Sequence, residues 1–165
     1  MIPSLGLKTK ILSLEELAAR AAELRRANMR VVLTNGCFDL LHIGHVRYLQ
    51  EARKLGDILV VAVNGDESVR ELKGAGRPIN PAVDRAEVLA ALCCVNFVTI
   101  FPEKRATKVI EKVRPAIYAK GGDYRLESLH PEELSMLTEI GAEVEIIPLV
   151  PGKSTTRLLE RLQGK

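Results

Sequence analysis

The sequence predicts a single α/β domain over residues 1–165, built on a doubly wound parallel sheet with helices on both faces. Three observations support this fold class. Short apolar runs alternate with longer segments of helical period along the whole chain. With 47% hydrophobic and 27% charged residues, 165 residues can bury one core and leave no room for a second domain. Neither an internal repeat nor a low-complexity linker interrupts the alternation.

The leading region, residues 1–29, contains a predicted amphipathic helix over 14–27. Ser13 precedes this segment as a candidate N-cap, and Glu16 stands at the spacing of a capping box. Apolar residues then recur every three or four positions, which is typical of a helix with one apolar face.

A β-α-β unit follows the leading helix. Residues 30–35 read as a short buried strand, and residues 42–56 as a helix that Gly56 ends. Residues 57–64 are apolar almost throughout, as expected for a strand that is buried on both faces of a sheet.

The alternation continues to the end of the chain. Helices are predicted over 66–73, 81–94, 106–113, 131–141 and 154–162, strands over 97–101, 116–120 and 143–149, and a Gly/Pro-rich loop over 74–80. Right-handed crossovers between parallel strands place the helices on both faces of the sheet. In such sheets ligands bind beyond the carboxyl ends of the strands, where the strand order reverses.

Charge and hydropathy exclude several classes of protein. The net charge of +3 is spread along the chain and aromatic residues make up only 4%, so nucleic acid is not an expected partner. No apolar run approaches the ~20 residues of a membrane span, and the N-terminal residues lack the apolar core of a signal peptide. We therefore expect a cytoplasmic protein that is not bound to a membrane.

The three cysteines carry no expected chemistry. Cys37, Cys93 and Cys94 form neither a disulfide framework nor a Cys-x-x-Cys metal spacing. Cys93 and Cys94 stand among apolar neighbours and are predicted to be small core residues.

Two histidines mark the predicted ligand site. His42 and His45 are three residues apart at the start of the helix over 42–56, where unpaired N–H groups and the helix dipole favour an anion. Gly44 between them allows a ligand to approach closely, while Asn35, Gly36 and Asp39 form a tight polar turn before the helix. Two histidines on a helix are often only structural, but a strand, a Gly-containing loop and a helix start together favour a phosphate site.

Basic residues follow in the next loop. Lys73 and Arg77 flank a glycine-containing segment, and Arg85 opens the following helix toward the same edge of the sheet. Such side chains suit a triphosphate or a sugar phosphate, and a solvated basic loop is the alternative.

Two later segments complete the candidate site. In "KGGDY", Gly121 and Gly122 can present backbone N–H groups, with Lys120 and Asp123 beside them. In "KSTT", Ser154 or Thr155 can cap the last helix and also meet phosphate. The alternatives are a plain strand-ending turn for the first segment and helix capping alone for the second.

The segments "TNGCFDLLHIGHVRYLQEARKLGD", "GRPINPAVDRAEVLAAL", "AKGGDY" and "KSTTRLLERL" together resemble the adenylyltransferases of the bacterial ADP-heptose pathway. The resemblance runs in order from Arg30 onward. The His-x-Gly-His motif alone indicates only the wider nucleotidyltransferase superfamily with its Rossmann-like fold. Aminoacyl-tRNA synthetases share the letters HIGH, but this chain is far too short for one and has no KMSKS segment.

The resemblance implies transfer of AMP from ATP to D-glycero-β-D-manno-heptose 1-phosphate, with Mg²⁺ held by the ATP phosphates and a homodimer as the assembly. It places His42, His45, Lys73 and Arg85 at the reacting phosphates. It assigns the adjoining nucleotide pocket to Asn35, Gly36, Phe38 and Asp39. From the chemistry of their segments we add the following residues to this pocket: Gly44, Lys120, Gly121, Gly122, Asp123, Ser154, Thr155 and Thr156. We assign Asp66, Arg77 and Tyr124 to the sugar phosphate. His130 is expected to lie far from these motifs.

Two other functions remain open at this stage. A cytidylyltransferase acting on glycerol 3-phosphate or a related phosphate would share the histidine motif. Those enzymes, however, carry an arginine and an isoleucine before Ser-Thr-Thr, whereas this chain reads "LVPGKSTT", which leaves Lys153 as a candidate phosphate contact. The second alternative is a nucleotide-binding regulator without catalytic activity.

Overall fold

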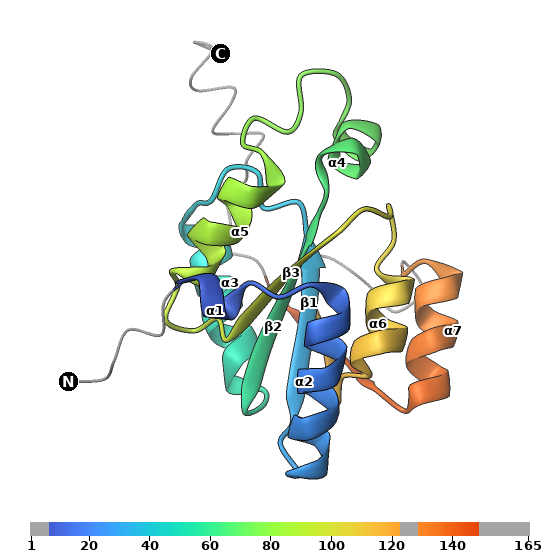
Figure 1. Cartoon of the computed structure of the whole chain (residues 1–165). Helices are drawn as coiled ribbons and strands as arrows, with labels where there is room; N and C mark the ends of the chain where they lie inside the picture. Colours follow the sequence, from blue (N-terminus) through green and yellow to red (C-terminus); the bar gives the residue numbers. More distant parts are fainter. Residues whose placement is uncertain (1–6, 123–128, 149–165) are drawn as a thin grey trace, which may run out of the picture.

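A computed structural model describes residues 7–122 and 129–148, which form three layers with a sheet between two layers of helices (Figure 1). The five strands are all parallel and follow the order β3-β2-β1-β4-β5. Their bounds are Val31–Gly36 (β1), Ile58–Asn64 (β2), Phe97–Phe101 (β3), Ile117–Gly121 (β4) and Glu143–Ile147 (β5). The predicted doubly wound parallel sheet is confirmed.

The helices divide between the two faces of the sheet (Figure 1). On one face lie α1 (Leu7–Lys10), α3 (Ile43–Lys54) and α5 (Ala82–Ala90), and on the other lie α2 (Leu14–Arg26), α6 (Thr107–Val113) and α7 (Pro131–Ile140). Helix α4 (Asp66–Lys73) lies past the carboxyl end of β2. The sequence did not predict α1, and the predicted helix over 154–162 lies outside the described residues. Within the described part of the chain, no helix is long and apolar enough to cross a membrane.

The central strands bury both of their faces. Val61 and Val63 of β2 join the core under α3 and α5, whereas Val60 and Ala62 join the core under α2, α6 and α7. All four side chains are fully buried. The nearly continuous apolar run in this segment therefore reflects helices on both sides of the sheet.

Local sequence signals account for several element boundaries. The Ser13 side chain accepts the N–H of Glu16, and the Glu16 carboxylate accepts the N–H of Ser13, so the predicted capping box is confirmed. Gly56 follows the end of α3. Glycine is needed here mainly because the Cβ atom of any other residue would lie 2.7 Å from the carbonyl oxygen of Arg30. Close packing of the chain, more than helix termination, thus explains this glycine.

Helix α5 ends at Ala90, four residues before the predicted end at residue 94. Nζ of Lys10 donates to the carbonyl oxygens of Ala90 and Val95 at 3.0 and 2.9 Å, which satisfies acceptors at the end of the helix. Cys93 lies in the turn that follows and is exposed, so its predicted place in the core is wrong. Cys94 is half-buried and packs against the core.

Strand order reverses between β1 and β4, because the connections from these neighbouring strands run to opposite sides of the sheet. Tyr48 of α3 fixes the helix above this point, since its O–H donates to the carbonyl oxygen of Ala119 at 3.0 Å. The hydroxyl oxygen of Tyr48 also lies 2.7 Å from Oγ1 of buried Thr34. Because the Tyr48 proton is already donated to Ala119, the Thr34 hydroxyl is the donor in this second hydrogen bond. The start of α3 is thereby held beside the reversal point, where ligands bind in this class of sheet.

Candidate active site

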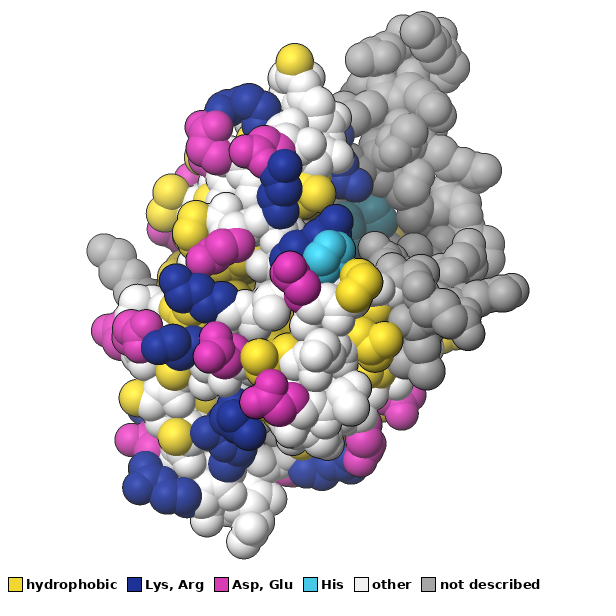
Figure 2. Space-filling view, turned by 90° about the vertical axis from the view of Figure 1, so that its right-hand side faces the viewer, with side chains coloured by type: hydrophobic (Ala, Val, Ile, Leu, Met, Phe, Trp, Pro, Cys, Tyr) yellow, Lys and Arg dark blue, Asp and Glu magenta, His cyan; other side chains and the backbone are white. Residues whose placement is uncertain are grey.

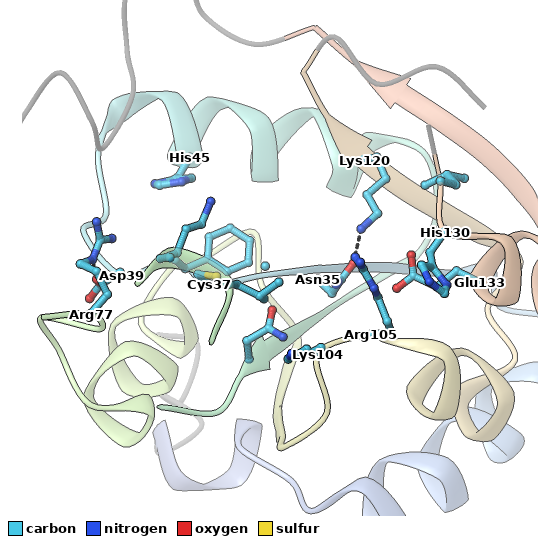
Figure 3. A pocket seen from close by; sticks show the side chains of 16 residues that line it. Asn35, Cys37, Asp39, His45, Arg77, Lys104, Arg105, Lys120, His130 and Glu133 are labelled. Atoms are coloured by element: carbon cyan, nitrogen blue, oxygen red, sulfur yellow. Dashed lines mark hydrogen bonds and ion pairs between the residues drawn. The ribbon is translucent and has the colours of Figure 1, made fainter. Parts of the chain in front are cut away.

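A cavity of about 390 Å³ opens at the carboxyl ends of the strands (Figure 3). Its volume lies within the range of small-molecule sites. Eight of the predicted site residues line it: Asn35, Gly36, Phe38, Asp39, His45, Lys73, Arg77 and Lys120. We call the part around Phe38, Asp39, His45, Lys73 and Arg77 the histidine end.

The two histidines are built into the start of α3. His42 is the N-cap, and its Nδ1 accepts the backbone N–H of Gly44 at 3.1 Å. The His45 ring stacks on the His42 ring, with centroids 3.9 Å apart, and Phe38 packs edge-on against His45. Because Nδ1 of His42 accepts a hydrogen bond, a neutral His42 carries its proton on Nε2. His45 lines the cavity, while His42 and Gly44 do not.

Both imidazoles are neutral near pH 7 in the unliganded site. Burial, helped by the nearby His42, lowers the pKa of His45 to about 4, and the Leu40 backbone only partly opposes this shift. Burial likewise lowers the pKa of His42. Nδ1 of His45 is buried and makes no hydrogen bond to any residue that the structure describes. An arriving phosphate would favour protonation of these rings, because an anion stabilises the charged form.

Asp39 fixes the loop between α4 and α5. Its carboxylate accepts the N–H groups of Ile79 and Asn80 at 2.8 and 2.9 Å and pairs with the guanidinium of Arg77. Burial alone would raise the pKa of Asp39, but these three donors together lower it. Asp39 is therefore a loop anchor that also orients Arg77 at the edge of the cavity.

Lys73 supplies a cation at the same edge of the cavity. Its ammonium group forms no hydrogen bond or ion pair with another described residue, and it lies near Cys37 together with Arg77 and Arg85. The pKa of the Cys37 thiol is raised, chiefly by burial, while these three cations act to lower it. Arg77 and Arg85 are paired with Asp39 and Asp66, so the Lys73 ammonium is the cation of this group that can compensate the charge of an anionic ligand.

Arg85 and Asp66 lie behind the cavity and do not line it. Arg85 is 2% exposed, and its guanidinium donates to the carbonyl oxygens of Cys37 and Asn80. It also pairs with Asp66 at 2.7 Å, and the same Asp66 oxygen accepts the N–H of Ala82. In this geometry the two residues join three segments of the site.

Asn35 lines the cavity next to the histidine end. Its Oδ1 accepts hydrogen bonds from the O–H of Tyr118 at 2.6 Å and from Nζ of Lys120 at 2.7 Å, and Figure 3 shows the second of these contacts. Lysine can only donate, so these contacts assign the oxygen of the amide and leave its NH₂ group available for a ligand. Burial lowers the pKa of Lys120, with a smaller contribution from Arg105, and Glu133 opposes the shift.

The remaining predicted residues follow β4 and β5. Gly121 ends β4, and Gly122 has a φ of 112°, a conformation that favours glycine, with its N–H donating to the carbonyl oxygen of Ile147. Neither of these glycines lines the cavity. The other members of this set lie outside the described residues: Asp123, Tyr124, Lys153, Ser154, Thr155 and Thr156.

The cavity also contains residues that the sequence did not indicate. One group lies where α6 and α7 meet the sheet, and we call it the α6–α7 end: Lys104, Arg105, Leu129, His130 and Glu133. The expectation that His130 lies far from the site is wrong, because the packing of α7 against α6 carries its first turn to the cavity. Figure 2 shows histidine side chains flanked by Lys and Arg side chains on this face of the molecule. Lys104 and Arg105 lie in the loop after β3, which ends at Phe101, so the rule that ligands bind at strand ends could have found them.

The fold and the cavity define a nucleotide-binding α/β domain with paired histidines at a helix start. A family model described as cytidylyltransferase-like matches residues 33–161. The chain therefore belongs to the cytidylyltransferase-like family of nucleotidyltransferases.

Individual relatives agree with this assignment. The chain is 48% identical over 154 residues to the bifunctional protein HldE of Geotalea uraniireducens and 49% identical to that of Citrifermentans bemidjiense. These matches cover 93% of the chain but only 31% of each relative. The chain thus spans about a third of the length of these curated relatives.

Two solved structures resemble the domain. A lipopolysaccharide core biosynthesis protein from Thermoplasma volcanium is 32% identical with a TM-score of 0.61, over 74% of this chain and 97% of that one. Pantoate-beta-alanine ligase from Francisella tularensis, in complex with beta-gamma ATP and beta-alanine, has a TM-score of 0.57 at 10% identity, over 93% of this chain and 76% of that one. The second likeness concerns the fold alone.

Proposed function

We propose that this domain transfers AMP from ATP to D-glycero-β-D-manno-heptose 1-phosphate and releases ADP-heptose and pyrophosphate. The observation that carries the proposal is the histidine end, where His45 and two cations face one cavity at the start of α3. Similarity to the bifunctional HldE proteins and to a lipopolysaccharide core biosynthesis protein supports the choice of substrate.

In the proposed reaction, an oxygen of the sugar phosphate attacks the α-phosphorus of ATP. A new phosphorus–oxygen bond forms, the bond from the α-phosphorus to the bridging oxygen breaks, and pyrophosphate leaves with that electron pair. Negative charge grows on the α-phosphoryl oxygens as the nucleophile arrives, so donors aimed at them stabilise the transition state. His45 would donate such a hydrogen bond, with His42 supporting its ring and Lys73 and Arg77 binding the triphosphate.

The domain would use Mg²⁺ that arrives with ATP. Among the described residues, no group of three or more His, Cys, Asp or Glu side chains is placed to hold a metal ion. The cavity instead presents cations and N–H donors, a set that fits phosphate oxygens already carrying a metal. Bound in that way, the ion would reduce the charge on the triphosphate.

A pyrophosphate-release assay tests the reaction. ATP and CTP are each supplied with heptose 1-phosphate, glycerol 3-phosphate and an unrelated sugar 1-phosphate. We expect turnover with ATP and the heptose phosphate. Preference for CTP and glycerol 3-phosphate would establish the cytidylyltransferase alternative. Tight ATP binding without pyrophosphate release from any pair would indicate a regulator.

We also propose a cytoplasmic homodimer, since the substrates would be made there. Val83 and Val88 of α5 are 60% and 49% exposed, and Ile79 in the preceding loop is 48% exposed. Exposed apolar side chains of this size favour contact with another protein surface. Light scattering on the purified protein would give twice the mass of one chain, and a mass of 18.2 kDa would exclude the dimer.

A further inference from the structure

We propose that the α6–α7 end of the cavity is the subsite for the sugar ring of the acceptor, a polyhydroxylated sugar phosphate. This inference rests on the proposed function and deepens it. The histidine end and the α6–α7 end belong to one continuous cavity, with Asn35 between them (Figure 3). An acceptor whose phosphate lies beside His45 would therefore extend its sugar toward Arg105, His130 and Glu133.

Glu133 is the fixed acceptor group of this subsite. Glu133 is only 4% exposed, and its Oε1 accepts the N–H of Ala106 at 2.8 Å. The carboxylate points from α7 into the cavity toward Arg105 (Figure 3). A carboxylate held by one backbone donor keeps lone pairs for further donors, and sugar hydroxyls are such donors.

Arg105 and His130 supply donors on either side of Glu133. Arg105 forms no ion pair with another described residue. Nδ1 of His130 is buried and without a hydrogen bond in the described part of the chain, since the nearest carboxylate oxygen, on Glu132, is 4.0 Å away. A guanidinium that is not paired within the described chain can donate several hydrogen bonds to hydroxyl groups, and the His130 side chain also lines this part of the cavity.

The chemistry of this end suits a sugar better than a base. Its described lining combines two cations, one carboxylate, one imidazole and Leu129, and it offers no Phe, Tyr or Trp ring. Bases bind well to aromatic faces, whereas hydroxyl-rich ligands need several directional donors and acceptors. Lys104 pairs with Glu71, which leaves one cation and one carboxylate of this set, Arg105 and Glu133, to face the neutral part of the acceptor. The phosphate is left to the histidine end.

Glu133→Gln and Arg105→Gln test the subsite. Glu133→Gln keeps an oxygen for the N–H of Ala106, so the start of α6 keeps its partner. We expect KM for heptose 1-phosphate to rise about tenfold or more in each variant, with KM for ATP changed less than about threefold. Glu139→Gln, on the exposed part of α7, is the matched control and should leave both constants unchanged.

The outcomes separate the subsite from the reaction. If the wild type uses heptose 1-phosphate and both folded variants keep its KM, the subsite assignment is overturned and the function stands. If the wild type releases no pyrophosphate with any sugar phosphate, the proposed function fails. The subsite is then decided by thermal shift with the sugar phosphate alone: a shift that Glu133→Gln abolishes supports it, and no shift in the wild type overturns it.

Discussion

The histidine end and the α6–α7 end of the cavity differ in which charged and neutral side chains they present to a ligand. At the histidine end, burial keeps His45 neutral, while Lys73 has no partner among the described residues. At the α6–α7 end, Glu133 lies among Lys120 and Arg105, so opposite charges already face each other. The first region offers an imidazole and an ammonium group to a phosphate, whereas the second sets a carboxylate beside cations, a combination that suits hydroxyl groups. We therefore expect variants at the first end to change kcat and variants at the second to change acceptor KM.

The largest expected effect comes from the histidine pair. His45→Ala should lower kcat by roughly 100-fold or more, about 2.7 kcal/mol of transition-state stabilisation, with a smaller change in ATP affinity. His42→Ala should act similarly and also lose about 1 kcal/mol of stability, because its Nδ1 caps α3. Steady-state kinetics and melting temperature are measured on the same preparations.

Gln50→Ala, on the exposed side of α3, is the control for this pair and should be silent. Full turnover by a folded His45→Ala protein would contradict the assignment of a phosphate site to the histidine end. Loss of stability with unchanged turnover per folded molecule would make the histidines structural.

Asp39→Asn gives the next largest effect, because it weakens the loop that carries Arg77. We expect a loss of about 1–3 kcal/mol in the free energy of unfolding and a lower kcat/KM for ATP. In the wild type, the lowered pKa means that this stabilisation is present above pH 3.8 and is lost as pH falls through the pKa of the folded state. Urea unfolding measures the change, and the exposed Asp84→Asn on the same side of the domain serves as the comparison. Equal stability of both variants would contradict the anchoring role.

A smaller effect concerns stability against pH. The folded pKa of His45 is about 4, below the unfolded value near 6.5, so the unfolded state binds more protons between these values. Stability should thus decline as pH falls from 6.5 toward 4, by roughly 1–3 kcal/mol after allowance for solvent screening. His45→Asn should show a shallower decline. Identical pH profiles for both proteins would mean that His45 is not buried as a neutral group.

The smallest effect is expected in the loop from Lys73 to Asn80. Lys73, Gly74 and Gly76 are exposed, and both glycines have positive φ with open space around them, whereas Asp39 holds the residues that follow. Trypsin should cut after Lys73, since Arg77 precedes a proline. Saturating ATP with Mg²⁺ should slow this cleavage as the loop orders over phosphate. Equal cleavage rates with and without ATP would show that Lys73 does not close over the ligand.

Sequence reasoning predicted the sheet well because its signals are local. The apolar run that forms β2, the capping box at Ser13 and the histidines at the start of α3 each depend on neighbouring residues. The end of α5 depends instead on Lys10, which is eighty residues away from Ala90. No local pattern could have placed that boundary.

The candidate site divides in the same way. Asn35, Asp39 and His45 lie at one strand end and in the loop and helix start that follow it, so one motif indicates all three. Glu133 and His130 reach the cavity only because α7 packs on α6, and nothing in "SLHPEE" indicates this. Arg85 was expected at the reacting phosphates, whereas its three hydrogen-bonded partners surround it inside the protein.

The contacts of Lys10 limit how far the N-terminus of this protein can be shortened. A fragment that starts at Ser13 would keep the whole amphipathic helix and appear complete by sequence. It would nevertheless lack the ammonium group that Ala90, Leu92 and Val95 share, at 3.0, 3.4 and 2.9 Å. Since α5 also carries Arg85, which binds the carbonyl oxygen of Cys37, such a cut would loosen a scaffold that ends at the active cavity. Expression boundaries should therefore be set upstream of α1.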